Sequence, residues 1–340
     1  MISIGAVAKL ARVSPATAAR VINNNGYVSQ EKQAAVMRAI EELGYIPNLM
    51  AGNLRRKRSN FIGYMLPVLS ENPFFTRFGN AFDQAAQEAG YQVLTAITHE
   101  DPDREKQLVT SLVGMMVEAI VFLGSMLGSD TIQWVLSQGV PVVMIEQPGK
   151  VYGADSIAID NYQAVQISLN HVISRGHRKI GFIGRAFRDS IVEQRYRGFM
   201  DGMQEHGLEP LSKNVCTMPD YSVEYGRQAI FRMLDGGDPP TAVVTTSDML
   251  ACGALQGLYE RGLRVPDDIS LVGFDNTVSA LSAPPLTSME LQPDLIGAAA
   301  VDMVIERRQK ERTSSKTVIF SPVLVDRGSV KVLPANSQQA

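Results

Sequence analysis

Three features of the 340-residue sequence predict an α/β fold with a small helical domain at its N-terminus. The first 47 residues contain three short helical patterns, and beyond Arg58 apolar, β-rich runs alternate with amphipathic segments. Strands that alternate with helices are typical of doubly wound parallel sheets, which helices cover on both faces. The chain is also 45% hydrophobic, so we expect a large core and more than one domain.

The N-terminal helices are marked by residues that favour helix ends. Each helix is expected to start after a serine that can cap it: Ser3, Ser14 and Ser29. Pro15 suits the first position of the second helix, and Gly44 ends the third. Residues 12–13 form a tight turn between the first two helices. Two short helices joined by a tight turn and braced by a third make a helix-turn-helix unit.

The second helix, in the stretch VSPATAARVIN, has an outward face made almost entirely of small side chains. The residues spaced for a core lie on its other side: Ala18, Val21 and Ile22. Only Ala16, Ala19 and Arg20 remain to face outward. Such a face suits close entry into a DNA major groove, with Arg20 long enough to reach a base edge or a phosphate. The alternative is an ordinary three-helix bundle with an alanine-rich surface, which the adjoining basic tract disfavours.

Charge is distributed unevenly along the chain. The net charge is −3, but residues 1–60 hold nine Lys or Arg and three Glu, a net charge of +6, which leaves −9 for the remainder. Four of these basic residues form the tract at 55–58. A basic head on an acidic body indicates a polyanionic partner for the head, although a solvated basic face would give the same count.

The body contains eight runs that we predict to be strands: FIGYMLPV, YQVLTAI, EAIVFLG, PVVMIE, SIAID, RKIGFIG, AVVTT and ISLVGFD. Its length of about 280 residues exceeds what one sheet usually serves, so we expect a division near Asp160 and Asn161.

An enzyme is the less favoured class for this body. The sequence has no P-loop, G-x-S-x-G, H-E-x-x-H or paired C-x-x-C motif, and its four histidines are scattered. Cys216 and Cys252 lie far apart, so we expect no disulfide and no thiolate metal site. We expect no catalytic residues, no metal and no cofactor. The sequence shows neither a signal peptide nor a long apolar span, which predicts a cytoplasmic protein without membrane contact.

Seven stretches carry a resemblance that covers essentially the whole chain: VAKLARVSPATAARVINNNGYVS, AIEELGYIPN, NPFF, RGHRKIGFIG, QRYRGF, GLRVPDDISLVGFDN and PPLTSMELQP. In this order and spacing they resemble the lactose-repressor (LacI/GalR) family of bacterial transcription regulators. The resemblance implies a helix-turn-helix headpiece at 1–47, a hinge helix or linker at 48–60, an effector-binding and dimerisation domain at 61–330 and a polar tail at 331–340. The effector domain should be two-lobed, similar to periplasmic binding proteins, with a doubly wound parallel sheet in each lobe.

The family also implies how the lobes are built. The first lobe is expected at about 61–160 and 290–320 and the second at about 161–289 and 321–330, with three crossovers between them. We expect the segment LTSMELQP and the helix after it in the first lobe, and TVIFSPVLVDRG as a final strand of the second. The implied assembly is a homodimer on palindromic double-stranded operator DNA. The tail has no leucine heptads, so we expect no tetramer.

The resemblance also implies which residues contact DNA, through the positions of this sequence that match the family's DNA-contacting positions. They fall on Pro15, Ala16, Thr17, Arg20 and Asn23 in the headpiece and on Leu54 and Arg55 in the hinge. The resemblance makes Leu54 a wedge in the minor groove, a known use of apolar side chains, with Arg55 supplying a cation beside it. Four residues depart from the family pattern: Gly5, Arg12, Ala19 and Gly52. Arg12 stands where the family has a glycine, and Gly52 costs a helical hinge roughly 1 kcal/mol relative to alanine.

Effector contacts are expected beyond the carboxyl ends of the strands, where open α/β sheets bind ligands. The positions that match the family's effector cleft are Phe74, Gln147, Asp160, Arg195, Tyr221, Ser247 and Asp275. Asp160 is equally suited to cap the following helix, while Phe75 is expected in the core and Asp248 as a structural cap. Arg195 and Asp275 are the strongest candidates. We expect them on opposite walls of the cleft, bridging the lobes and clamping adjacent hydroxyls of the ligand.

The residue types favour a sugar or a sugar acid, such as gluconate, as the effector. Gln147 stands where a purine-binding member has an indole, so a purine would lack one stacking partner. The segment EQRYRGF is similar to that of gluconate-responsive members, and Arg185 and Arg188 lie nearby in sequence. We therefore expect a repressor whose operator affinity is controlled by this ligand. The alternatives are a regulator responsive to a purine or another metabolite, a sugar-binding protein that binds no DNA, and a sugar-processing enzyme.

Overall fold

The computed structural model describes residues 2–23, 25–46, 59–67, 73–124, 129–146, 153–186, 190–309 and 312–334. Most of the expected hinge, including Leu54 and Arg55, lies outside these residues, as does Gln147. The chain divides into two compact units, one built mainly from residues 1–60 and one from the α/β body that begins at Phe61.

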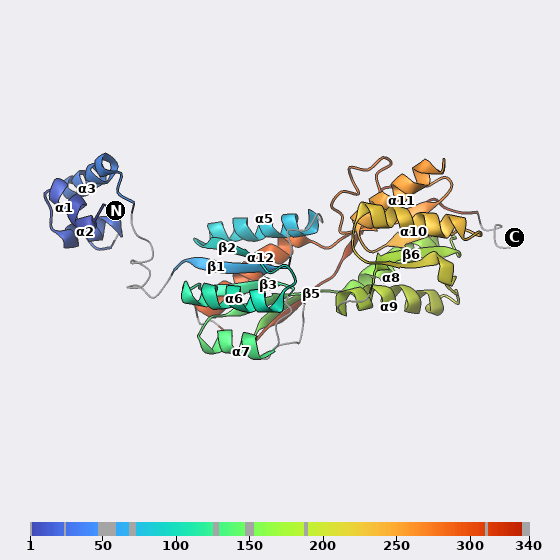
Figure 1. The fold of residues 1–340 in the computed structure, drawn as a ribbon, viewed down its shortest axis with the longest axis horizontal. Coiled ribbons are helices and arrows are strands. Elements are labelled where there is room, and N and C mark those ends of the chain that lie inside the picture. Colours follow the sequence, from blue (N-terminus) through green and yellow to red (C-terminus); the bar gives the residue numbers. More distant parts are fainter. Residues whose placement is uncertain are drawn as a thin grey trace. The chain divides into compact units, whose positions relative to one another are not determined.

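The N-terminal unit consists of the three predicted helices, drawn in blue in Figure 1: α1 (Ile4–Leu10), α2 (Pro15–Ile22) and α3 (Gln30–Leu43). The Ser3 hydroxyl accepts a hydrogen bond from the backbone N–H of Ala6 at 3.3 Å, and the Ser14 hydroxyl accepts one from Thr17 at 3.1 Å. These bonds satisfy backbone donors that have no partner within the helix. Gly44 follows α3 with a left-handed φ of 58°, as the sequence predicts for a helix stop.

One small core holds the three helices together. Its buried residues come from all three: Val7, Ala8, Ala18, Val36 and Ala39. Val21 and Ile22 of α2 pack against it. Pro15, Ala16 and Arg20 of α2 are exposed. The predicted outward face is therefore confirmed for Ala16 and Arg20, whereas Ala19 is half-buried.

The body contains two six-stranded sheets, which confirms the predicted α/β class. The first has the order β11-β5-β4-β3-β1-β2 and is parallel throughout. Its strands are β1 (Phe61–Leu66), β2 (Gln92–Ile97), β3 (Ala119–Leu123), β4 (Val142–Ile145), β5 (Asp155–Ile159) and β11 (Thr317–Phe320). The second has the order β12-β10-β9-β8-β6-β7, and only β12 runs antiparallel to its neighbour among the described strands. Its strands are β6 (Ile180–Arg185), β7 (Val215–Met218), β8 (Ala242–Thr245), β9 (Ser270–Phe274), β10 (Thr287–Glu290) and β12 (Val323–Val325).

Helices cover both sheets and define two lobes (Figure 1). The first lobe has α5 (Pro73–Glu88), α6 (Pro102–Gly114), α7 (Ser129–Ser137) and α12 (Pro293–Arg308), and the second has α8 (Asn161–Ser174), α9 (Ser190–Glu205), α10 (Val223–Asp235), α11 (Asp248–Glu260) and a short 3₁₀ turn at Ser212–Asn214. Helix α5 packs against α12, α8 against α9, and α10 against α11.

The chain crosses between the lobes three times, and two details differ from the sequence prediction. The crossings lie between β5 and α8, between β10 and α12, and between β11 and β12. The strand within LTSMELQP is β10, which pairs with β9 in the second lobe, so only the helix after it belongs to the first. The segment TVIFSPVLVDRG is not one strand but two, since β11 pairs with β5 in the first lobe and β12 pairs with β10 in the second.

Three phenylalanines of α5 extend from the core of the first lobe to the carboxyl edge of its sheet. Phe74, Phe78 and Phe82 are four residues apart, so they share the buried face of the helix. Phe78 and Phe82 stack with ring centroids 6.0 Å apart. Because α5 begins at Pro73, after the carboxyl end of β1, Phe74 lies in its first turn at the edge of the sheet where ligands are expected.

Candidate functional site

The exposed face of α2 is the candidate nucleic-acid surface. Pro15, Ala16 and Arg20 lie on it, while Thr17 and Asn23 are half-buried. The Thr17 hydroxyl lies 2.9 Å from that of Ser14, and the Asn23 amide donates to the Ala19 carbonyl at 2.7 Å. Both polar side chains therefore also secure the ends of the helix.

The turn before α2 contains a residue in an unusual conformation. Arg12 has a φ of 52°, in the left-handed region that glycine adopts without cost. The turn therefore holds an arginine in a conformation that favours glycine.

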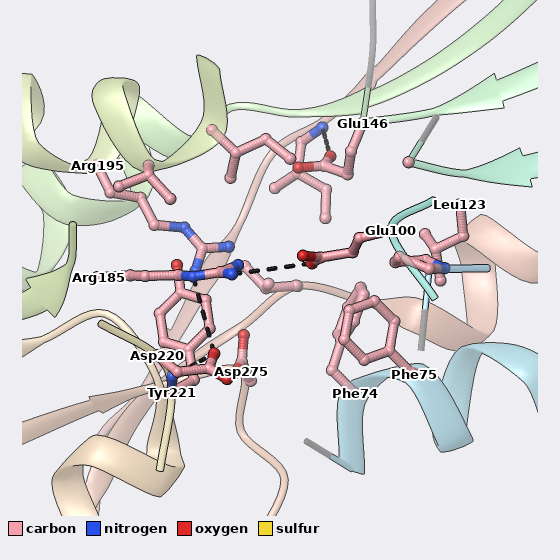
Figure 2. Close-up of a pocket in the computed structure, with 16 residues that line it drawn as sticks. Phe74, Phe75, Glu100, Leu123, Glu146, Arg185, Arg195, Asp220, Tyr221 and Asp275 are labelled. Carbon is pink, nitrogen blue, oxygen red and sulfur yellow. Dashed lines mark hydrogen bonds and ion pairs between the residues drawn. The ribbon is translucent and has the colours of Figure 1, made fainter. Parts of the chain in front are cut away.

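A cavity of about 320 Å³ lies in the body at the carboxyl ends of the strands (Figure 2). This volume is at the small end of the range of roughly 300–1,000 Å³ typical of ligand pockets. Its described lining comes from both lobes and from the crossover after β10. The first lobe supplies Pro67, Phe74, Phe75, Glu100, Leu123, Gly124, Glu146 and Ile159, the crossover supplies Leu291, and the second lobe supplies Arg185, Ile191, Val192, Arg195, Asp220, Tyr221 and Asp275.

The first lobe supplies an aromatic wall. Phe74 and Phe75 come from the first turn of α5 and meet edge to face, with ring centroids 5.9 Å apart. Figure 2 shows both rings at the side of the cavity that faces the arginines. An apolar ring face of this kind can lie against the C–H face of a sugar or against a planar base.

Arg195 of α9 is a buried guanidinium fixed by the protein on several sides. Its Nε donates to Asn161 Oδ1 at 2.8 Å, its Nη1 donates to the Thr246 carbonyl at 2.9 Å, and the guanidinium lies 4.2 Å from the Phe274 ring centroid. Within the part of the chain that the structure describes, no acceptor is hydrogen-bonded to Nη2. The position of the arginine is therefore set by the protein, and one of its nitrogens remains to bind a ligand.

Glu146 and Asn161 connect this arginine to the first lobe. The Glu146 carboxylate follows β4 and accepts from the Ile159 backbone N–H at 2.6 Å and from Asn161 Nδ2 at 2.7 Å. Asn161 is the first residue of α8, and its other amide atom accepts from Arg195. A buried chain of hydrogen bonds thus runs from the first lobe through the crossover to the cavity arginine.

Asp275 lies on the loop after β9, with a left-handed φ of 92°. The loop is held by the buried carboxylate of Asp248, which accepts from the backbone N–H groups of Phe274 at 2.9 Å, Thr277 at 2.6 Å and Ser279 at 3.1 Å. Gly273 allows this approach, because a Cβ there would lie 2.4 Å from Asp248 Oδ1. Asp248 is therefore the structural residue that the sequence predicts, and it positions Asp275.

Four of the seven predicted effector residues line the cavity: Phe74, Arg195, Tyr221 and Asp275. Asp160 instead caps α8, accepting from the Gln163 N–H at 2.9 Å, and lines a smaller neighbouring cavity. Ser247 is buried and caps α11, accepting from the Met249 N–H at 3.1 Å. The expected bridge between lobes is wrong, because Arg195 and Asp275 both follow the first crossover and belong to the second lobe.

The cavity includes residues that the sequence argument left out of the site: Phe75, Glu100, Glu146, Arg185 and Asp220. Arg185 is the last residue of β6, and Glu100 and Asp220 follow β2 and β7 within three residues. A rule that takes each polar residue near the carboxyl end of a strand would have found the four polar residues of this set. Phe75, predicted to be in the core, lines the cavity while also packing against the core.

No group of three or more His, Cys, Asp or Glu side chains that could hold a metal ion occurs within the residues that the structure describes. The helices of these same residues include none with the length and hydropathy needed to span a membrane.

Residues 3–48 match the sequence model for bacterial regulatory proteins of the lacI family, and residues 169–330 match that for the periplasmic binding protein-like domain. The chain is 32% identical to the HTH-type transcriptional regulator DegA of Bacillus subtilis (strain 168), over 96% of this chain and 97% of that protein. It is 31% identical to the HTH-type transcriptional repressor PurR of Mannheimia succiniciproducens, over 97% and 99%.

Solved structures agree with these relatives. The Lac repressor dimer bound to operator and the anti-inducer ONPF matches with a TM-score of 0.86 and 26% identity, over 97% of this chain and 99% of that one. The transcriptional regulator CelR in complex with cellobiose matches with a TM-score of 0.72 and 27% identity, over 97% and 100%. The chain therefore belongs to the lacI family of bacterial regulatory proteins. It is a DNA-binding transcriptional regulator with a helix-turn-helix headpiece.

Proposed function

We propose that the protein is a repressor that binds a palindromic operator as a homodimer, with its operator affinity controlled by a small sugar or sugar acid bound in the cavity. The observation that carries this proposal is the fixed, buried guanidinium of Arg195, which lies in the same cavity as the Asp275 carboxylate and the Phe74 ring. A guanidinium donates and a carboxylate accepts, so together they suit the hydroxyls of a sugar.

The headpiece supports the DNA-binding half of the proposal. The exposed face of α2 offers small residues for close approach to a major groove and Arg20 for a base contact. Leu54 and Arg55 are proposed to bind the minor groove from the hinge by analogy with the family. The Lac repressor relative was solved as a dimer on its operator, which supports the same assembly here.

The relatives support a sugar as the ligand but do not identify which sugar it is. CelR was solved with cellobiose, whereas other relatives are named PurR, so a purine-responsive regulator is the alternative that a ligand screen must distinguish. We further propose that the protein has no enzymatic activity and acts in the cytoplasm, because the relatives named here are regulators.

Two measurements test this function. Arg20→Ala is expected to weaken operator binding by about 1–3 kcal/mol if Arg20 makes a bidentate base contact, and an unchanged preference for operator over random duplex would exclude that contact. A thermal-shift screen against sugars, sugar acids and purines identifies the ligand, because a ligand that binds the native state raises the melting temperature.

With that ligand, Arg195→Ala and Asp275→Asn are each expected to weaken binding about tenfold to a hundredfold, since charge-assisted hydrogen bonds contribute roughly 1.5–3 kcal/mol. Calorimetric titration measures the loss, and thermal melts detect any structural damage. Normal ligand affinity in either variant would remove that residue from the site.

A further inference from the structure

Arg185 places donor groups in the cavity that the protein does not satisfy. Its side chain is 15% exposed, and its Nε is buried without a hydrogen-bond partner in the described chain. The nearest carboxylates are Glu100, whose Oε1 lies 3.8 Å from Nη2, and Asp220, whose Oδ1 lies 3.7 Å from Nε. Both distances allow an ion pair but exceed a normal hydrogen bond. Because a buried donor without an acceptor costs free energy, this guanidinium has unused binding capacity.

The guanidinium and its carboxylates differ in exposure. The side chains of Glu100 and Asp220 are 42% and 66% exposed, so they lie nearer the solvent than Arg185 does. Exposed ion pairs contribute little to stability, and an exposed carboxylate can exchange its partner for water at small cost. The two acids therefore balance the charge of Arg185 without occupying its donors.

The ion pair between Arg185 and Glu100 joins the two lobes. Arg185 ends β6 of the second lobe, whereas Glu100 follows β2 of the first. Figure 2 shows the two side chains meeting within the cavity, with the dashed line of the pair between them. The Tyr221 ring lies 5.6 Å from the guanidinium carbon and supports it from the second lobe. The Glu100 carboxylate thus lies against the donors that a ligand between the lobes would reach.

We propose that Arg185 is a specificity-determining residue that binds an acid group of the ligand, a carboxylate or a phosphate, and that this group takes the place of the Glu100 carboxylate. The inference deepens the proposed function and rests on it. The planar fork of a guanidinium matches both kinds of acid group through two parallel hydrogen bonds. When the Glu100 carboxylate moves away from Arg185, an acid group of the ligand supplies a negative charge in its place. A neutral hydroxyl would not, and the positive charge of the largely buried Arg185 would then be less well balanced.

The remaining charges of the cavity agree with this assignment. Glu146 is engaged by two N–H donors, and Arg195 donates to Asn161 and Thr246. Arg185 and Arg195 are the two arginines of the described lining, and only Arg195 is hydrogen-bonded to other described residues. A sugar acid would then place its hydroxyls at Arg195 and Asp275 and its acid group at Arg185.

The first test uses inorganic phosphate as the probe and needs no identified ligand. Full-length wild type, Arg185→Gln, Glu100→Gln and a control, Arg264→Gln, are melted in phosphate and in chloride of equal ionic strength. Arg264 is a matched control, since it also lies beside two carboxylates, at 3.4 and 3.5 Å, but is 72% exposed and outside the cavity.

We expect Arg185→Gln to weaken phosphate binding by about tenfold or more, because it removes a charge-assisted, bidentate donor. Glu100→Gln is expected to tighten it by up to about fivefold, because it removes a competing exposed carboxylate. Arg264→Gln should bind as the wild type does. Equal phosphate affinity in the wild type and Arg185→Gln, or no phosphate-specific stabilisation of Glu100→Gln, would overturn the assignment. If Arg185→Gln does not fold, the phosphate affinity of Glu100→Gln still tests the proposal.

A second test separates the two sources of the acid group. Calorimetric titrations with D-gluconate, D-glucose 6-phosphate and D-glucose present a carboxylate, a phosphate ester and a neutral control. Tighter binding of either acid than of D-glucose, lost in Arg185→Gln, supports the assignment and names the source. If D-glucose or another neutral sugar binds the wild type and Arg185→Gln equally and more tightly than the acids, Arg185 does not select an acid, yet the sugar-responsive repressor still stands. If no compound that binds alters operator affinity, the proposed function itself fails.

Discussion

At the scale of single residues, Arg12 shows a local conflict between sequence and backbone. Its left-handed φ of 52° costs an L-residue roughly 1–2 kcal/mol relative to a conformation that it prefers. Arg12→Gly should relieve this strain, and the greater freedom of glycine in the unfolded chain offsets part of the gain. We expect amide hydrogen exchange in α1 and α2 of the full-length protein to slow by about fivefold, equivalent to about 1 kcal/mol.

The control for this prediction is Arg38→Gly, which places glycine at an exposed position inside α3. Glycine in a helix interior costs about 1 kcal/mol, so this variant should speed exchange. Faster exchange in both variants would mean that the turn at Arg12 holds no strain.

His177 gives the body a dependence on pH. Its ring is buried and is hydrogen-bonded to the Thr241 hydroxyl at 2.9 Å and to the Lys331 carbonyl at 3.1 Å. Burial lowers the pKa of His177 below its usual value of 6.5. The hydrogen bond to the Lys331 carbonyl partly opposes this shift, whereas the charges of Lys331 and Arg175 add to it. The unfolded chain then binds more protons than the folded one, so the free energy of unfolding falls as the pH drops from 6.5 towards the pKa of the folded state.

Denaturant unfolding between pH 7.5 and 5 measures this effect. His177→Gln should be less stable than the wild type at pH 7.5, because it disturbs a buried network, but should show a shallower decline on acidification. His171 also has a pKa lowered by burial, so part of the decline should remain. An identical slope in the wild type and His177→Gln would show that His177 does not titrate with unfolding.

At the scale of elements, the loop after β9 depends on a carboxylate in α11. Asp248 accepts hydrogen bonds from three backbone N–H groups of this loop and from the Ser288 hydroxyl at 2.7 Å. In Asp248→Asn, an NH2 group replaces one of the two acceptor oxygens and faces N–H or O–H donors that it cannot bind. We therefore expect the free energy of unfolding to fall by about 3 kcal/mol. It should also weaken ligand binding, because Asp275 would lose its fixed position.

Thermal melts and calorimetry on Asp248→Asn and Asp275→Asn separate the two roles. Asp248→Asn should lower both the melting temperature and the ligand affinity, and Asp275→Asn mainly the affinity. An Asp248→Asn protein that melts as the wild type does would contradict the structural role.

Elements with a strong local pattern could be predicted from the sequence, whereas those defined by distant partners could not. The eight apolar runs are all strands, and the caps at Ser3 and Ser14 form as expected. Ser29 precedes α3 as predicted, but its side chain makes no capping hydrogen bond. The strand β7 could not be predicted because VCTM has only four residues and includes the exposed Thr217. The assignment of β11 was wrong because it pairs with β5 about 160 positions away, and nothing in its own residues shows which sheet it joins. The assignment of β10 was wrong because the chain crosses to the first lobe only after this strand, which pairs with the nearby β9.

The site could be predicted to a similar extent and for similar reasons. Strand-end reasoning and the family pattern reached Phe74, Arg195, Tyr221 and Asp275, which line the cavity. Whether a polar residue caps a helix or faces a ligand depends on the angle at which the helix leaves its strand, and the sequence does not reveal this angle. For this reason Ser247 was placed in the site although it caps α11.

At the scale of the whole molecule, the cavity connects directly to contacts between the lobes. Asn161 links Arg195 to Glu146, and Arg77 of α5 donates to the carbonyl of Asn276, the neighbour of Asp275, at 3.1 Å. A ligand that binds Arg195 or Asp275 and shifts their side chains therefore changes the hydrogen bonds that connect the two lobes. A ligand with different affinities for two lobe arrangements shifts the balance between them, and this is how we expect it to alter DNA affinity.

The most direct test of this account is the affinity for a palindromic operator, selected from random duplexes, measured by fluorescence anisotropy with and without the ligand identified by thermal shift. Coupling between sites is typically 1–3 kcal/mol, so we predict that saturating ligand changes the operator affinity of the wild type by about 5-fold to 150-fold. The same ligand concentration should leave the operator affinity of Arg195→Ala nearly unchanged. A ligand that occupies the cavity of the wild type without changing its operator affinity would contradict the account.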